Sequence, residues 1–188
     1  MNIAITTHQY SEPFGAVSLC ASREGDRVAL AALIFGDSDD CCEMLESKGP
    51  ESIALVCPAA DLELKDVLDR AHSALERYLA SGEIDTTLPL APRGTAFDRE
   101  VWSLLCSIER GSTRTYGELA RSLGKPGGAQ AVGGACGRNP IAIFIPCHRV
   151  LDARGSLHGY AGGLARKAAL LEREGVMIEN AGLFARAV

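Results

Sequence analysis

A short apolar run at 141–145 lies between two prolines and leads directly into Cys147, His148 and Arg149. Its length, its prolines and its β-branched or aromatic residues predict a buried, extended segment that ends at the rim of a cavity. A thiol reacts as the thiolate, and a neighbouring histidine and arginine lower the pKa of a cysteine. The segment therefore predicts a nucleophilic thiol at Cys147. For an isolated Cys-His pair, a buried structural cysteine beside a surface histidine is the competing interpretation.

The length of 188 residues fits one large domain or two small ones. Prolines and a glycine mark a linker at 83–95, so we place a boundary near residue 88, with domains at 1–88 and 89–188. No stretch is long and apolar enough to span a membrane, and the N-terminus lacks the basic start and apolar run of a signal peptide. We therefore expect a soluble cytoplasmic protein. Its seven cysteines, an odd number without framework spacing, should be mostly free and buried.

Charge is divided unevenly along the chain. Residues 1–90 carry 6 basic and 16 acidic side chains, a net charge of −10. Residues 91–188 carry 13 basic and 8 acidic side chains, a net charge of +5, which accounts for the overall −5. The C-terminal half is therefore the half that can meet a polyanion, and the N-terminal half would repel one.

The first half has the pattern of a small α/β domain with a short antiparallel sheet. Apolar and β-branched runs predict strands, and one apolar face at helical spacing predicts a long helix. The expected strands are 2–7, 15–21, 27–35 and 52–57, and the expected helices are 39–47 and 61–81. We interpret His8 and His72 as solvated or packed side chains rather than metal ligands. No recognisable chemistry is found in this half, and we expect it to have a structural role.

The second half is mainly helical and has the outline of a winged-helix-like helix-turn-helix. We expect helices at 97–109, from 116 to 122 or 123, and at 129–135. Thr115 and Glu118 fit a capping box at the start of the second of these helices. The third presents almost no side-chain volume, so it cannot read base edges with long side chains but can lie close to a narrow groove or a backbone. Tight packing inside the protein explains its small residues equally well.

Several blocks of residues occur in the order and spacing of one known family. They are Arg93–Phe97, Val101-Trp102, Thr115–Ala120, Ala131–Gly134, Asn139-Pro140, Pro146–Val150, Gly159–Leu164, Lys167 and Leu170–Gly175. Together they cover about residues 88 to 178, and so many blocks in one order are a specific signal. The chain resembles the O6-alkylguanine-DNA alkyltransferases, also called methylated-DNA–protein-cysteine methyltransferases. The resemblance implies a DNA-repair protein that moves a methyl or alkyl group from O6-alkylguanine in DNA irreversibly to its own cysteine. It leaves O4-alkylthymine open as a further substrate.

The resemblance assigns five catalytic roles. Cys147 is the nucleophile and alkyl acceptor, and His148 is the general base that takes the thiol proton through a water. Glu174 orients the histidine, as in a triad. Asn139 fixes the turn before the active-site strand, and Tyr116 is a phenol near the flipped base that can protonate the departing guanine. Without the resemblance, Glu174 would also fit a surface glutamate and Tyr116 a packed aromatic. Because a thioether is a poor leaving group, each molecule would act once, and no cofactor is needed.

The resemblance also implies that the target nucleotide is flipped into a pocket and that helix 129–135 lies in the minor groove of double-stranded DNA. The expected contacts to substrate or DNA are Gln130, Ala129, Gly133, Arg138, Arg149, Tyr160, Ala161 and Gly162. Arg149 fits a structural ion pair better than a catalytic role. Gln130 stands where most relatives carry an arginine that fills the gap left by the flipped base, and glutamine has no charge and stacks less well. We therefore expect weaker DNA binding or flipping, with Arg138 or Arg114 compensating at phosphates.

Two other functions are weighed against this one. A non-catalytic sensor of alkylated DNA would lack the acceptor cysteine, so the presence of Cys147 argues against it. A methylation-responsive transcriptional regulator would carry a zinc-ligating cysteine cluster in its N-terminal part, and residues 1–90 lack one. We expect a monomer that binds DNA and no membrane.

Overall fold

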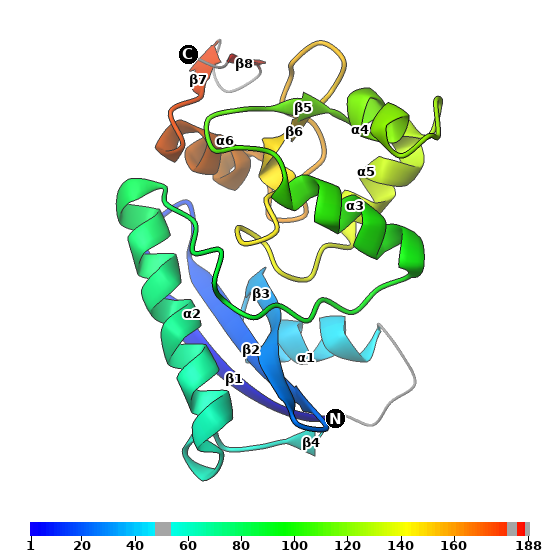
Figure 1. Cartoon of the computed structure of the whole chain (residues 1–188). Coiled ribbons are helices and arrows are strands. Elements are labelled where there is room, and N and C mark those ends of the chain that lie inside the picture. The colour runs from blue at the N-terminus through cyan, green and yellow to red at the C-terminus, as the bar shows by residue number, and fades with distance from the viewer. Residues whose placement is uncertain (48–53, 180–183, 187–188) are drawn as a thin grey trace. The chain divides into compact units, whose positions relative to one another are not determined.

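The computed structural model describes residues 1–47, 54–179 and 184–186, and the chain divides into two compact units (Figure 1). Unit 1 comprises Met1–Tyr78, Ile84–Arg93 and Pro140–Ala142, and unit 2 comprises Leu79–Glu83, Gly94–Asn139 and Ile143–Val188. Most of the expected linker at 83–95 therefore packs with unit 1. Among the described residues, no helix combines the length and the apolar character that crossing a bilayer requires.

Unit 1 is built on a four-stranded sheet in the order β3-β2-β1-β4. The strands are β1 (Asn2–Gln9), β2 (Ala16–Glu24), β3 (Arg27–Phe35) and β4 (Ala54–Leu55). The first three are antiparallel, which confirms the expected sheet, and β4 runs parallel to β1. β4 falls within the strand expected at 52–57, of which residues 52 and 53 lie outside the described part. β2 is buried from Val17 to Ser22 because it has a neighbour on either side.

Two helices accompany this sheet, as the apolar spacing predicted. α1 (Ser38–Glu46) begins at a capping box, in which the carboxylate of Asp37 accepts from the second and third backbone amides beyond it. α2 (Leu62–Ser81) follows the short 3-10 turn η1 (Pro58–Ala60) and lies along the sheet in Figure 1. Its buried residues recur at helical spacing: Leu64, Val67, Leu68, Ala71, Ala74, Leu75 and Tyr78. The amphipathic helix expected at 61–81 is therefore confirmed.

Unit 2 is mainly helical. Its elements are α3 (Ala96–Cys106), β5 (Arg114–Thr115), α4 (Tyr116–Ser122), α5 (Ala129–Gly137), η2 (Cys147–Arg149), β6 (Val150–Leu151), α6 (Leu164–Arg173), β7 (Met177–Glu179) and β8 (Phe184–Arg186). α4, a turn and α5 form the expected helix-turn-helix, and the capping box of Thr115 and Glu118 starts α4 as predicted. α3 ends three residues earlier than expected, because the hydroxyl of Ser107 bonds the carbonyl of Leu104 at the last turn.

The apolar run at 141–145 is largely buried as predicted, but it is not extended, and this expectation was wrong. Ile141 forms a bridge to Leu33 of β3, after which the chain turns at 142–144, with Ile143 at a φ of 70°. η2 then follows Pro146 directly. The side-chain amide of Asn139 donates a hydrogen bond to the carbonyl of Ile145 at 2.8 Å, so this backbone group is satisfied without a strand partner.

Candidate functional site

Cys147 is the first residue of η2 and is only 7% exposed. Its Sγ accepts a hydrogen bond from Nδ2 of Asn139 at 3.1 Å, and the same amide donates to the carbonyl of Ile145. Burial raises the pKa of Cys147, whereas the hydrogen bond from Asn139 and the positive charge of Lys167 act to lower it. The sulfur is therefore held in a fixed direction, with two groups that stabilise its anion.

His148 and Glu174 are brought together at the end of α6. Nε2 of His148 lies 2.9 Å from Oε1 of Glu174, and both side chains are fully buried. Burial opposes ionisation of Glu174, but hydrogen bonds from His148 and Arg149 lower its pKa to about 2. Burial lowers the pKa of His148, although Glu174 acts in the opposite direction. The pair is thus a neutral imidazole oriented by a carboxylate, which is the state a general base requires.

Arg149 completes this buried network. Its Nε and Nη2 donate to the two oxygens of Glu174, each at 2.8 Å, and its Nη1 donates to the carbonyl of Ile108 just beyond α3. The expected ion pair of Arg149 is therefore confirmed. Its side chain is 5% exposed and engaged inside unit 2, so the structure does not support the expected contact with DNA.

Tyr116 and Lys167 meet at one backbone carbonyl. The Tyr116 hydroxyl donates to the carbonyl of His158 at 3.2 Å, and the fully buried Lys167 donates to the same oxygen at 2.9 Å and to the carbonyl of Val150 at 2.6 Å. Burial lowers the pKa of Lys167 to about 8, opposed first by the neighbouring Cys147, and burial raises the pKa of Tyr116. Lys167 thus connects Val150, which follows η2 directly, to the loop that contains Tyr160.

The comparisons with known proteins agree on one family. The model of the 6-O-methylguanine DNA methyltransferase, DNA binding domain, matches residues 96–176. A methylated-DNA–protein-cysteine methyltransferase of Methanosarcina acetivorans is 43% identical over 143 residues, which are 76% of this chain and 90% of that relative. The chain belongs to the methylated-DNA–protein-cysteine methyltransferase family.

Solved structures of this methyltransferase family share the fold of both units. The Mycobacterium tuberculosis OGT in complex with DNA has a TM-score of 0.68 and 35% identity, with 93% of this chain and 92% of that chain covered. The O6-methylguanine-DNA methyltransferase from the hyperthermophilic archaeon Pyrococcus kodakaraensis has a TM-score of 0.63 and 27% identity, with 93% and 99% covered. The mixed α/β fold expected from the sequence is therefore confirmed.

The second helix of the helix-turn-helix keeps the small surface expected for this methyltransferase family. Gln130 is exposed, and Ala129 and Gly133 are half-buried. A Cβ added at Gly133 would lie 3.8 Å from the ring of Tyr116, so the helix passes the aromatic ring at van der Waals distance. Both interpretations of the small residues therefore apply to α5. One side of the helix packs against Tyr116, and the other side is exposed and can approach a groove.

The loop 158–163 contains the remaining expected residues, and its first carbonyls lie at the hydroxyl of Tyr116. Tyr160 and Gly162 are half-buried and Ala161 is exposed. The hydroxyl of Tyr116 lies 3.3 Å from the carbonyl of Gly159, and Arg166 donates to the carbonyl of Gly162 at 2.9 Å. The loop is therefore held at both ends by side chains of unit 2.

Sequence reasoning missed two buried charged residues in this methyltransferase. Lys167 was noted only as part of a motif, although its spacing from the buried Leu170 and Leu171 on α6 places it on the inner face. Asp98 is 1% exposed and pairs with Arg138, one of the expected DNA contacts. The Thr95–Asp98 capping box was a signal for the position of Asp98, but not for its burial.

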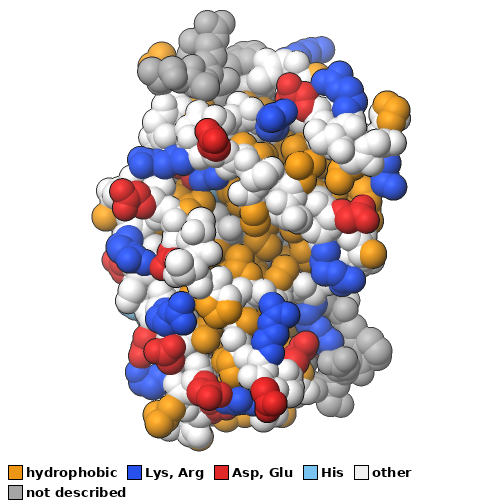
Figure 2. Space-filling model, viewed as in Figure 1, with side chains coloured by type: hydrophobic (Ala, Val, Ile, Leu, Met, Phe, Trp, Pro, Cys, Tyr) orange, Lys and Arg blue, Asp and Glu red, His pale blue; other side chains and the backbone are white. Residues whose placement is uncertain are grey.

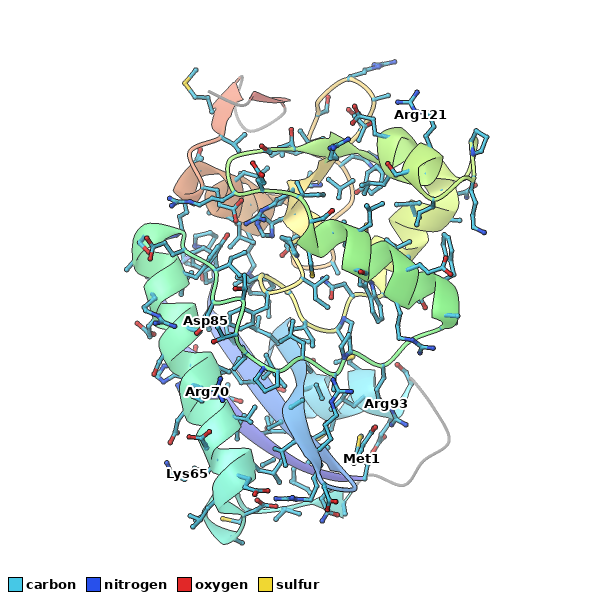
Figure 3. The ribbon with its side chains drawn as sticks, viewed as in Figure 1. Met1, Lys65, Arg70, Asp85, Arg93 and Arg121 are labelled. Atoms are coloured by element: carbon cyan, nitrogen blue, oxygen red, sulfur yellow. The ribbon has the colours of Figure 1, made fainter. Side chains whose placement is uncertain are left out.

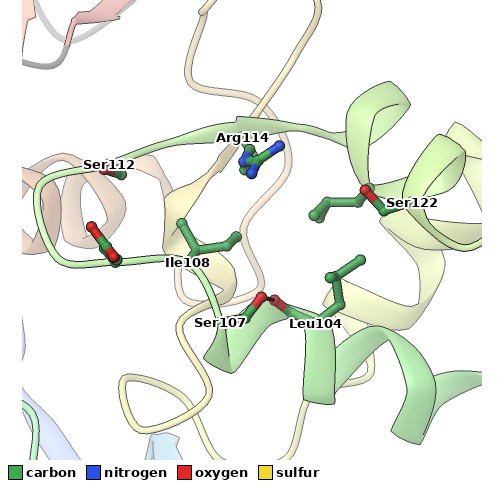
Figure 4. Close-up of a pocket in the computed structure, with 8 residues that line it drawn as sticks. Leu104, Ser107, Ile108, Ser112, Arg114 and Ser122 are labelled. Atoms are coloured by element: carbon green, nitrogen blue, oxygen red, sulfur yellow. Dashed lines mark hydrogen bonds between the residues drawn. The ribbon is translucent and has the colours of Figure 1, made fainter.

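A separate hollow of about 220 Å³ lies between α3 and α4 (Figure 4). It is lined by Leu104, Ser107, Ile108, Glu109, Ser112, Arg114, Leu119 and Ser122. None of the expected catalytic residues lines it. Among the described residues, no group of three His, Cys, Asp or Glu side chains is arranged to hold a metal ion.

Proposed function

We propose that this protein repairs DNA by direct reversal, accepting the alkyl group of an O6-alkylguanine on Sγ of its own Cys147. The observation that carries the proposal is the buried constellation in which Cys147 is held by Asn139 and is followed directly by a His148–Glu174 pair. A nucleophile, a neutral base and an orienting carboxylate are the parts that thiolate chemistry needs. Relatives named methylated-DNA–protein-cysteine methyltransferases support the same activity.

The chemistry is a single displacement. The Cys147 thiol gives its proton to His148 through a water, and the sulfur forms a bond to the alkyl carbon as the bond from that carbon to O6 breaks. The electron pair leaves on the guanine, which takes a proton from a donor such as Tyr116 and is restored. The product thioether does not regenerate a thiol, so each molecule reacts once. Lys167 and Asn139 stabilise the thiolate that forms before the displacement.

The depth of the sulfur implies that the damaged nucleotide leaves the duplex. Because Cys147 is only 7% exposed, its sulfur cannot reach the alkyl group on O6 of a stacked guanine, so the base has to enter the site at a cost of roughly a few kcal/mol. The exposed side of α5 fits a minor groove because its residues are small, and we assign to the exposed Gln130 the role of filling the vacated stack. O4-alkylthymine would enter by the same route.

Of the two arginines that the sequence suggested for contacts to phosphate, we retain Arg114 and replace Arg138 by Arg121. Arg138 already pairs with Asp98, whereas Arg114 and Arg121 belong to β5 and α4 and have exposed side chains (Figure 3 labels Arg121). We assign the phosphate contacts to Arg114 and Arg121. We further propose that residues 89–188 carry catalysis and DNA binding, and that residues 1–88 have a structural role.

The test is intact-protein mass spectrometry after incubation with a duplex that contains one O6-methylguanine. We expect a gain of one methyl group, mapped to the Cys147 peptide, and no gain in Cys147→Ala. Binding of the duplex without any mass gain would replace this proposal by the sensor function. The variant Gln130→Arg separates a slow flipping step from a missing activity, because it should speed transfer only if the acceptor is competent. A duplex with O4-methylthymine, run in parallel, defines the substrate range.

A further inference from the structure

Asp98 is a buried carboxylate that the mechanism above does not use. It is 1% exposed and occupies the third position of α3, where its Oδ2 accepts from the backbone and the hydroxyl of Thr95 at 3.0 and 2.8 Å. The first of these bonds, together with the bond from the Asp98 backbone N–H to the Thr95 hydroxyl at 3.1 Å, forms the capping box of the helix. Its other oxygen, Oδ1, is directed out of the box and accepts from Arg138.

Two nitrogens of Arg138 donate to the same carboxylate oxygen. Nε and Nη2 of Arg138 donate to Oδ1 of Asp98 at 3.1 and 2.6 Å. Burial opposes ionisation of Asp98, but the hydrogen bonds from Arg138 and Thr95 keep its pKa below the usual range. The guanidinium also lies over Gly134, where an added Cβ would be 3.1 Å from Nη1. The Arg138 side chain is therefore fixed, although it is 51% exposed.

Arg138 immediately precedes the residue that holds the reactive sulfur. It is the C-terminal cap of α5, and the next residue, Asn139, donates to Sγ of Cys147 at 3.1 Å and to the carbonyl of Ile145 at 2.8 Å. The amide reaches both acceptors only if the last turn of α5 is correctly placed. A shift of Arg138 therefore moves the Asn139 amide relative to the sulfur.

α3 holds this turn at a second point. Nε1 of Trp102, one turn beyond Asp98, donates to the carbonyl of Ala135 at 2.9 Å. The Trp102 ring is held on its other side by Gly94, where an added Cβ would lie 2.4 Å from the ring. Asp98 and Trp102 thus form a two-point clamp of α3 on the end of α5. Of the two contacts, only that of Asp98 reaches the residue next to Asn139.

We propose that Asp98 is a positioning residue for the nucleophile: by fixing Arg138 it holds the amide of Asn139 on Sγ of Cys147. The inference rests on the proposed function, since that function makes Cys147 the acceptor. Because Asp98 is buried, it acts through Arg138 and not through contact with DNA. Loss of the contact should withdraw a hydrogen bond from the thiolate and so make Cys147 less reactive at a given pH.

The experiment measures alkylation of Cys147 by iodoacetamide, from about pH 6 to about pH 10, in the whole protein without DNA. The variants are Asp98→Asn and Arg138→Gln, and the exposed Cys57 in the same chain is the internal reference. Peptide mass mapping gives both rates. We expect the Cys147 rate near neutral pH to fall about threefold or more in each variant, and its pH midpoint to rise by about half a unit, with Cys57 unchanged.

Thr95→Ala is the matched control, because it removes the other half of the capping box and leaves the Asp98–Arg138 contact in place. It should lower the melting temperature and leave the Cys147 pH profile unchanged. Arg138→Gln alters a half-exposed side chain, so it keeps the test available if Asp98→Asn does not fold. Folded Asp98→Asn and Arg138→Gln proteins with the wild-type Cys147 profile would overturn the proposal.

Because iodoacetamide alkylates Cys147 in the absence of DNA, the test of the positioning role does not depend on methyl transfer from DNA. A Cys147 profile that moves in both variants of a protein that takes no methyl group from DNA would defeat the proposed function and leave the positioning role intact. Methyl transfer from DNA together with an unmoved profile would defeat only the positioning role.

Discussion

At the scale of single residues, one carboxylate serves two partners in this site. Glu174 accepts from His148 and twice from Arg149, and all three side chains are buried. The arginine compensates the charge that burial would otherwise make costly, and it keeps Glu174 ionised beside the imidazole. The same three bonds therefore stabilise unit 2 and orient the base.

Glu174→Gln should lower both the stability of the fold and the rate of methyl transfer. Removing the charge leaves Arg149 buried without its counter-ion, so we expect a loss of about 3 kcal/mol in unfolding free energy at neutral pH. Methyl transfer should slow about a hundredfold because the imidazole loses its orienting anion. Since the pKa of Glu174 is lowered to about 2, its contribution is present above the unfolded value of about 4.3 and is lost as pH falls towards 2. The stability gap between variant and wild type should close over that range.

Glu174→Gln has two readouts. Urea unfolding at several pH values measures stability, and single-turnover transfer of the methyl group from DNA to the protein measures the reaction. The control is Glu172→Gln, an exposed glutamate near the end of the same α6. A Glu174→Gln protein with wild-type stability at pH 7 would contradict the prediction.

At the scale of elements, the sequence predicted those helices and strands that residue spacing and capping residues determine locally. The strands, the amphipathic α2 and the Thr115 capping box follow from spacing and turn chemistry, and the structure confirms them. The turn at 142–144 was missed because an apolar run does not reveal the long-range bridge from Ile141 to Leu33 or the side-chain hydrogen bond from Asn139 to the carbonyl of Ile145. The burial of Asp98 was missed because its partner, Arg138, lies forty residues away at the C-terminal cap of α5.

The packing of α2 on β1 supports a prediction of its own. The rings of His8 and His72 stack with centroids 3.7 Å apart, and Glu76 lies 3.5 Å from His72. Burial, and then the charge of His72, lowers the pKa of His8, while Glu76 acts in the opposite direction. A histidine with a lowered folded pKa binds a proton more readily when unfolded, so it destabilises the fold as pH falls below about 6.5.

We therefore expect the melting temperature to decrease between pH 8 and pH 5.5, and His8→Gln to reduce that decrease. His158→Gln, which changes an exposed histidine in unit 2, should leave the decrease in place. An unaltered acid-induced loss in His8→Gln would show that the stacked pair is not its source.

At the scale of the whole molecule, the two halves of the sequence carry opposite charge. Residues 1–90 have a net charge of −10 and residues 91–188 a net charge of +5. Figure 2 shows charged side chains of both signs interspersed on one face of the molecule. The net charge of a half therefore does not identify the residues that contact DNA, and individual cations of unit 2 have to supply the contacts to phosphate.

The dependence of DNA affinity on salt distinguishes local contacts from overall charge. Each lysine or arginine that neutralises a phosphate releases counterions, so its removal lowers the slope of log affinity against log salt by about 1. We expect this for Arg121→Gln on α4 and not for Arg70→Gln on α2, which changes the net charge by the same amount (Figure 3). Fluorescence anisotropy with an unmodified duplex at several salt concentrations measures both slopes without any methyl transfer. Equal slopes in the two variants would mean that the protein responds to DNA through its total charge, and the assignment of the phosphate contacts to unit 2 would then fail.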